Sequence, residues 1–235
     1  MSAPAADRRQ ELAANLAAVR ERIAGACAAA GRDPAEVTLV VVTKFFPADD
    51  VRLLADLGVR HVGENRHQEA EAKVAACADL PLEWHFIGTL QSNKAAAVAG
   101  YADVVESVDR AKLLSGLARG AHERGRPLDC LVQVSLDDAA GRGGAPVDEV
   151  VPLAGRLRET EGLRLRGVMA VAPLGAPPLP AFERLQEVAA AVRSLDPGAS
   201  WISAGMSADL EDAVRCGATH VRIGSAVLGP RPVIK

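Results

Sequence analysis

Lys44 is the residue of this 235-residue chain whose setting points most directly to chemistry. It closes the segment Val37-Thr-Leu-Val-Val-Val-Thr-Lys44, which is apolar or β-branched on both faces, and it shares a face with Val40 and Val42. An amine among apolar neighbours loses its proton more readily, and the neutral amine is the form that attacks an aldehyde to give a Schiff base. The alternative is a strand-end lysine that extends its ammonium group into water.

Two segments near the end of the chain have the composition of a phosphate site. Ser203-Ala-Gly-Met-Ser-Ala-Asp209 joins a predicted strand to a predicted helix with Ser207 as the expected N-cap, and Val221-Arg-Ile-Gly-Ser225 ends the next strand on small residues. Both segments leave backbone N–H groups open, as phosphate sites after the seventh and eighth strands of a barrel do. Ordinary turn chemistry is the alternative, because Gly and Ser are common in any loop.

Arg222 lies two residues before Gly224 on one predicted strand, so it points to the interior or the mouth of a barrel. A guanidinium only donates hydrogen bonds, so opposite a pyridine nitrogen it would keep that nitrogen unprotonated and weaken the ring as an electron sink. The alternative is an ion pair with an inward carboxylate such as Glu64. His85, on the third strand, is expected to be a satisfied interior histidine.

The elements that position these residues alternate between strand and helix. An alanine-rich helix over about 5–31 comes first, with apolar residues at helical spacing. Strands are predicted near 37–44, 61–65, 83–88, 104–108, 128–135, 163–171, 199–204 and 220–227, and helices near 47–57, 66–78, 92–101, 109–124, 147–160, 180–195 and 208–216.

This order predicts an α/β protein with a parallel sheet, and eight strands predict closure into a single (β/α)8 TIM barrel domain over residues 1–235. The N-terminal helix is extra, and it either fills the eighth helical place or caps the bottom of the barrel. An open, doubly wound sheet is the alternative, because periodicity does not show closure.

Composition narrows the possible partners and location. The net charge is −3 and the basic residues are scattered, which argues against nucleic acid and anionic membranes as partners. The four cysteines form no CxxC pair, so neither a zinc site nor a disulfide framework is expected, and free thiols fit a reducing cytoplasm. Neither a signal peptide nor an apolar run of about 20 residues is recognisable, so we expect a cytoplasmic protein.

Six ordered motifs resemble those of the pyridoxal phosphate homeostasis proteins, a family related to the N-terminal barrel of alanine racemase. The motifs are Val42-Thr-Lys44, Gly63-Glu-Asn65, Trp84-His-Phe-Ile-Gly88 with Leu90-Gln-Ser-Asn-Lys94, Gly167-Val-Met-Ala170, Gly205-Met-Ser-Ala-Asp209 and Val221-Arg-Ile-Gly-Ser-Ala226. The resemblance implies pyridoxal 5′-phosphate (PLP) bound as a Schiff base on Lys44, with Arg222 facing the pyridine nitrogen. It also implies that Asn65 lies beside the cofactor and that the phosphate is held by Ser203, Ser207, Gly224 and Ser225.

Two positions depart from the family pattern. Phe46 stands where the family usually has a second lysine, and Arg142 replaces a lysine of the loop after the fifth strand. Phe46 cannot form an imine, so a handover of cofactor between two lysines would have to proceed differently in this chain.

The resemblance favours a carrier over an enzyme. Alanine racemases use a second base, a tyrosine from an added β-domain, whereas this chain ends soon after its eighth predicted strand and its one tyrosine, Tyr101, is expected away from the barrel mouth. We therefore expect a non-catalytic protein of intracellular vitamin B6 homeostasis, a monomer or weak dimer that passes PLP to apo-enzymes. The alternatives are a weak fold-type III, racemase-like PLP enzyme and a Schiff-base aldolase acting on a phosphosugar.

Overall fold

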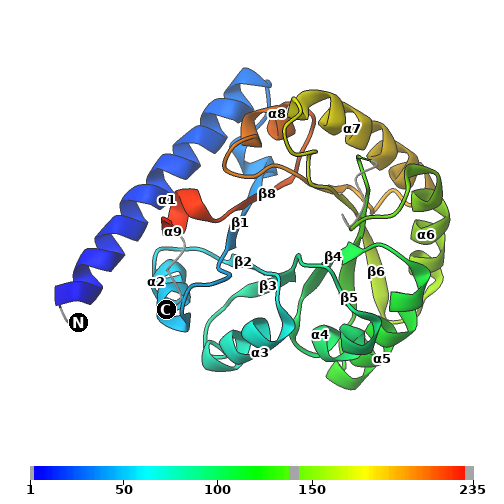
Figure 1. Ribbon diagram of the computed structural model, residues 1–235, viewed down its shortest axis with the longest axis horizontal. Helices are drawn as coiled ribbons and strands as arrows, with labels where there is room; N and C mark the ends of the chain where they lie inside the picture. The colour runs from blue at the N-terminus through cyan, green and yellow to red at the C-terminus, as the bar shows by residue number, and fades with distance from the viewer. Residues whose placement is uncertain (1–2, 138–142, 231–235) are drawn as a thin grey trace.

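The strands close into a barrel, as the alternation of elements predicts (Figure 1). The computed structural model describes residues 3–137 and 143–230, and in it eight parallel strands pair in chain order until β8 returns to β1. The strands are β1 Thr38–Val42, β2 His61–Glu64, β3 Glu83–Phe86, β4 Val104–Val108, β5 Leu128–Gln133, β6 Leu163–Met169, β7 Trp201–Ser203 and β8 His220–Ile223. Closure rules out the open, doubly wound alternative.

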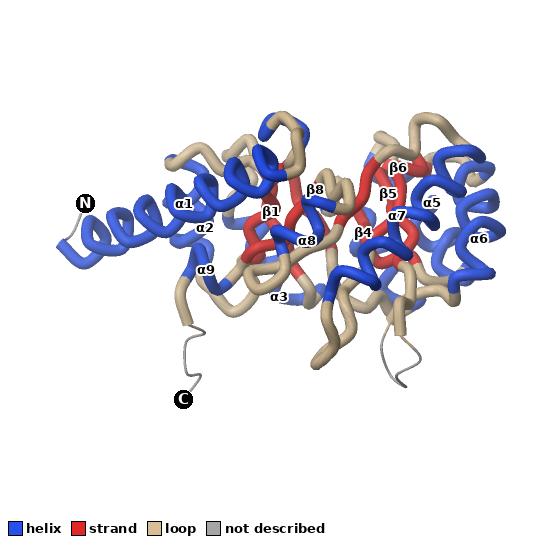
Figure 2. The backbone as a smooth tube through the Cα atoms, turned by 90° about the horizontal axis from the view of Figure 1, so that it is seen from above, coloured by secondary structure: helices blue, strands red, loops and turns tan. Residues whose placement is uncertain are grey.

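Helices surround the barrel, and Figure 2, turned by 90° from the view of Figure 1, shows the strands lying among them. The α-helices are α1 Ala3–Ala29, α2 Ala48–Asp56, α3 His67–Ala76, α4 Ala95–Tyr101, α5 Leu114–Arg124, α6 Val147–Glu159, α7 Pro178–Leu195, α8 Leu210–Arg215 and α9 Ser225–Leu228. Short 3-10 turns η1 Pro34–Glu36, η2 Ser92–Lys94 and η3 Ala111–Leu113 precede β1, α4 and α5. None of the described helices combines the length and the apolar composition needed to span a bilayer.

Helix α1 fills the eighth helical place, because it lies along the outside of the barrel beside α8 and α9 (Figure 1). Its inward stripe of Leu12, Leu16, Val19 and Ile23 is at most 5% exposed, which agrees with the helical period of these residues. The chain then turns at Gly31, whose φ of +66° is the left-handed conformation common after helix ends. The extra N-terminal helix is therefore part of the layer of helices around the barrel.

Two local predictions near the C-terminus were wrong. The predicted strand 220–227 ends at Ile223, and a one-turn helix, α9, begins at Ser225, because four residues are too few to show a helical period. Ser207 is not an N-cap: α8 begins at Leu210, and Asp209 precedes it and accepts a hydrogen bond from the Met206 N–H through Oδ1 at 2.6 Å. The loop residue Arg142 lies outside the described residues.

Candidate functional site

A cavity of about 490 Å³ opens among the C-terminal ends of the strands. This volume lies in the range of about 300–1,000 Å³ that is typical of small-molecule sites. Six of the seven residues that sequence analysis assigned to a cofactor line it, namely Lys44, Asn65, Ser207, Arg222, Gly224 and Ser225. The seventh, Ser203, is fully buried in the barrel interior and does not line the cavity.

Lys44 lies in a sharp turn that follows β1. The strand ends at Val42, so Lys44 is half-buried at the cavity wall, less enclosed than the apolar run predicted. The next residue, Phe45, has a φ of +72°, the one positive φ outside glycine among the described residues, and its N–H donates to Glu69 Oε1 at 2.5 Å. Such backbone strain persists only where neighbouring groups enforce it, and it is often found at functional sites.

A buried ion network holds this turn in place. Lys73 Nζ donates to the carbonyl of Thr43 at 2.7 Å, to Glu64 Oε1 at 2.6 Å and to Glu69 Oε1 at 2.7 Å. The hydroxyl of Thr43 also donates to Glu64 Oε1, at 2.7 Å. Burial raises the pKa of Glu64, and the nearby Lys73 ammonium opposes that rise.

This network was not predicted, because its members come from the turn after β1, from β2 and from α3, and the Lys73–Glu64 contact has no local signature. The Glu69–Lys73 pair at i,i+4 was the one visible signal, and such a pair is usually solvent-exposed. The network makes Lys73 the residue that joins α3 to the backbone beside Lys44.

Arg222 is fixed from two sides in the barrel interior. Its guanidinium donates to Ser203 Oγ at 2.6 Å and to the carbonyl of Ala170 at 2.7 Å, and Ser203 in turn donates to Glu106 Oε2 at 2.6 Å. The carboxylate that faces Arg222 is Glu106, at 3.9 Å, so the suggestion of Glu64 was wrong. Glu64 faces Lys73 instead.

His85 completes this interior arrangement, as its expected role as a satisfied core histidine requires. Its Nδ1 lies 2.8 Å from Glu106 Oε1, and its side chain is fully buried. Burial works against ionisation of Glu106, but the hydrogen bond from His85, together with Arg222 and Ser203, lowers the pKa of Glu106 to about 2. Ser203 therefore supports Arg222, and its assignment to the phosphate stays a prediction.

The loops after β7 and β8 supply small residues and backbone donors. Gly205 has a φ of +90°, and a Cβ there would lie 2.7 Å from the Ala213 side chain, so this loop requires glycine. Arg22 of α1 donates to the Ser207 carbonyl at 3.1 Å and anchors the loop. Helix α9 starts at Ser225, and the first N–H groups of a helix have no acceptor within it, which suits an anion.

Asn65 and Gly88 form another part of the wall. Asn65 Oδ1 is buried and has no hydrogen-bond partner among the described residues, so it is an acceptor that a ligand could satisfy. A Cβ at Gly88 would lie 2.2 Å from the Asn65 carbonyl oxygen, so the two strand ends approach closely only because position 88 is glycine.

Phe46, at the position of the missing second lysine, is 7% exposed and belongs to the core cluster that contains the α1 stripe. The guanidinium of Arg8 lies 5.8 Å from its ring centroid. The side chain is therefore a packing residue at the edge of the cavity. Taken together, the cavity offers a primary amine, a guanidinium, hydroxyls and backbone N–H groups, a donor set that suits a small phosphorylated aldehyde.

The barrel and its cavity define a protein of the alanine racemase N-terminal domain class, and the model of that family matches residues 9–232. The chain is 46% identical to the pyridoxal phosphate homeostasis protein of Mycobacterium bovis, with 96% of this chain and 95% of that protein covered. It therefore belongs to the pyridoxal phosphate homeostasis protein family.

Solved structures agree with this assignment. PipY of Synechococcus elongatus, determined with PLP bound, is 35% identical with a TM-score of 0.81, over 93% of this chain and all of that one. Alanine racemase from Streptomyces coelicolor shares the fold with a TM-score of 0.73 at 20% identity, and the match covers 93% of this chain and 58% of the racemase.

Proposed function

We propose that this protein binds PLP as a Schiff base on Lys44 and takes part in intracellular vitamin B6 homeostasis without strong catalytic activity. The observation that carries the proposal is the single cavity that joins Lys44 to Arg222, Ser207 and Ser225. The family membership and the PLP-bound PipY relative support it.

The residues present fit PLP. Asn65 Oδ1, which has no partner among the described residues, is an acceptor for a ligand. Glycine at positions 88 and 224 allows the strand ends around the cavity to pack closely, since a Cβ at Gly224 would lie 3.3 Å from the Val42 carbonyl oxygen. The positive and hydroxyl groups suit a phosphate, and the lysine suits an aldehyde.

Each residue then has a distinct task. PLP supplies an aldehyde that condenses with a primary amine with loss of water, which would retain the cofactor covalently on Lys44. Ser207 and Ser225, with the N–H groups that begin α9, would bind the phosphate. Arg222 would face the pyridine nitrogen and, because it donates only, keep that nitrogen unprotonated. Glu106 and Ser203 hold the guanidinium in position.

The carrier role rests on the cavity lining, where the described residues include no carboxylate, histidine or tyrosine that could act as a second base beside Lys44. Tyr101 is the one tyrosine of the chain, and its hydroxyl lies 3.4 Å from His67 Nδ1 rather than at the cavity lining. Burial raises its pKa, so its hydroxyl stays protonated at neutral pH and cannot accept a proton. An unprotonated pyridine nitrogen also stabilises carbanions weakly, so retention and release of PLP fit these groups better than racemisation.

The experiment is a transfer assay. Protein loaded with PLP is mixed with an apo PLP-dependent enzyme and a phosphatase that destroys free PLP, and recovered enzyme activity is compared with that from an equal amount of free PLP. We expect protected transfer from the parent protein and none from Lys44→Ala. Amino-acid racemisation by the loaded protein at rates typical of racemases would contradict the carrier role and favour the weak-enzyme alternative.

A further inference from the structure

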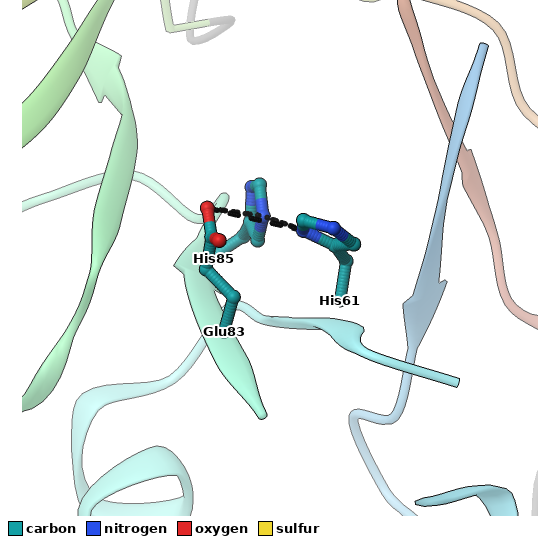
Figure 3. A group of neighbouring side chains, drawn as sticks. All are labelled: His61, Glu83 and His85. Atoms are coloured by element: carbon teal, nitrogen blue, oxygen red, sulfur yellow. Dashed lines mark hydrogen bonds and ion pairs between the residues drawn. The ribbon is translucent and has the colours of Figure 1, made fainter. Parts of the chain in front are cut away.

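A second cluster of chemically active side chains lies at the opposite end of the barrel from Lys44. His61 and Glu83 begin β2 and β3 and are paired in register, and His85 follows Glu83 by two residues on the same face (Figure 3). His61 Nδ1 lies 3.1 Å from His85 Nε2, and Glu83 Oε1 lies 3.8 Å from the first nitrogen and 3.7 Å from the second. Two imidazoles and a carboxylate therefore converge on one point.

The spacing of the three donor atoms fits a metal ion. A point equidistant from them lies about 2.1 Å from each, which is the usual length of Zn–N and Zn–O bonds. Two imidazoles and one carboxylate are also the protein ligands of many zinc sites that keep a fourth position open. Small rotations of the partly exposed side chains of His61 and Glu83 would direct their lone pairs at the ion.

The least mobile ligand, His85, is already oriented by a carboxylate. Glu106 Oε1 lies 2.8 Å from His85 Nδ1, and both side chains are at most 1% exposed. This contact places the ring proton on Nδ1 and leaves the Nε2 lone pair facing the cluster. Metal-bound histidines usually have such a carboxylate behind them, and it increases the basicity of the ligating nitrogen.

The cluster is accessible from solvent. The side chains of His61 and Glu83 are 29% and 38% exposed, and both residues line two surface hollows of about 350 and 490 Å³ at the N-terminal end of the barrel. An ion could enter by either hollow, and water or a small ligand could take the fourth position. The neighbouring carboxylate Asp129 is already paired with Arg164, at 2.6 Å.

We propose that His61, Glu83 and His85 bind a divalent transition metal of the zinc class at the N-terminal face of the barrel. The site is separate from the cavity that contains Lys44, and the proposal does not depend on what that cavity binds. The cysteine spacing predicts no zinc site, but these ligands are histidine and glutamate residues on neighbouring strands. On metal binding the ring proton of His61 would move from Nδ1 to Nε2, which frees the Nδ1 lone pair for the ion. His61 keeps one ring proton throughout, so no other reactant is required.

The test uses tag-free, full-length protein treated with a chelator and then titrated with Zn²⁺ by calorimetry, and with Co²⁺ by visible absorption. We expect one ion per chain, and we expect His61→Ala and Glu83→Gln each to weaken Zn²⁺ binding at least tenfold. His122→Ala, which removes an exposed imidazole on α5, is the matched control and should bind as the parent does. Both ligand variants change partly exposed side chains, and thermal unfolding checks that they fold.

Four outcomes would overturn the proposal, and three of them concern binding itself: no binding of either ion at millimolar concentration, binding that survives both ligand variants unchanged, or an intense near-ultraviolet thiolate-to-cobalt band. The last would assign the ion to cysteines, since the proposed ligands contain no sulfur. Binding weakened equally by His122→Ala would mean adventitious surface coordination and would also refute the site.

Discussion

Replacing Lys73 with methionine tests whether the buried network positions the turn that carries Lys44. Methionine keeps the apolar stem but removes three hydrogen bonds of 2.6–2.7 Å and the cation opposite Glu64, whose side chain is 2% exposed. Removing one partner of a buried ion pair costs about 3–5 kcal/mol. Because Glu64 can take up a proton, we expect about 3 kcal/mol, or a Tm lower by about 6–12 °C.

Urea and thermal unfolding measure this change, with Lys112→Met, at an exposed lysine of η3, as the control. Without Lys73 the pKa of Glu64 in the folded protein rises further above its unfolded value, so the folded form binds a proton more readily. The stability deficit of Lys73→Met should therefore shrink as the pH falls through the raised pKa of Glu64. The variant should also bind PLP more weakly, since the Thr43 carbonyl is released. A free energy of unfolding within about 0.5 kcal/mol of the parent would refute this reasoning.

Three further changes probe other parts of the structure. Gly88→Ala places a Cβ 2.2 Å from a backbone oxygen and should lower the free energy of unfolding by about 1–3 kcal/mol. Gly100→Ala, with open space around its Cβ, should not lower it. Equal stability of the two variants would contradict the close packing at Gly88. Burial holds the pKa of His220 at about 3, so the unfolded chain gains a proton on this residue before the folded protein does. The folded protein should therefore lose stability as the pH falls from about 6.5 towards 3. His220→Asn should flatten this pH dependence in urea titrations, and an unchanged slope would exclude His220 as its source. Ser225→Asp puts a negative charge at the start of α9 and should weaken PLP binding by about tenfold or more, with Ser194→Asp as an exposed control; equal affinities would remove the phosphate from α9.

Fold prediction succeeded where the residues carry a long periodic or apolar pattern. The segment that became β1 is apolar on both faces, as a strand buried between the barrel interior and the helices requires. The apolar residues of the α1 stripe recur at helical spacing over about three turns. The prediction failed at α9, where Ser225–Leu228 makes a single turn after a β-branched strand. Local pattern cannot distinguish such a turn from a longer strand.

The residues that line the site were easier to predict than the contacts that hold them in place. Lys44, Asn65 and Arg222 stand at strand ends, where barrel sites form, and the structure brings them to one cavity. Lys73 holds the Thr43 carbonyl beside Lys44, and Glu106 faces Arg222; both contacts join separate elements of the chain, and a single sequence contains no record of them. The choice of Glu64 rather than Glu106 as the partner of Arg222 failed for this reason.

Locating the cofactor on the chain tests whether PLP is attached to Lys44. Protein incubated with PLP is examined by near-ultraviolet and violet absorption before and after borohydride, and the reduced adduct is then located by peptide mass. We expect an imine band that disappears on reduction, a mass increment on the peptide that contains Lys44, and no such increment in Lys44→Ala. A colourless protein, or a reduced adduct on any other lysine, would contradict it.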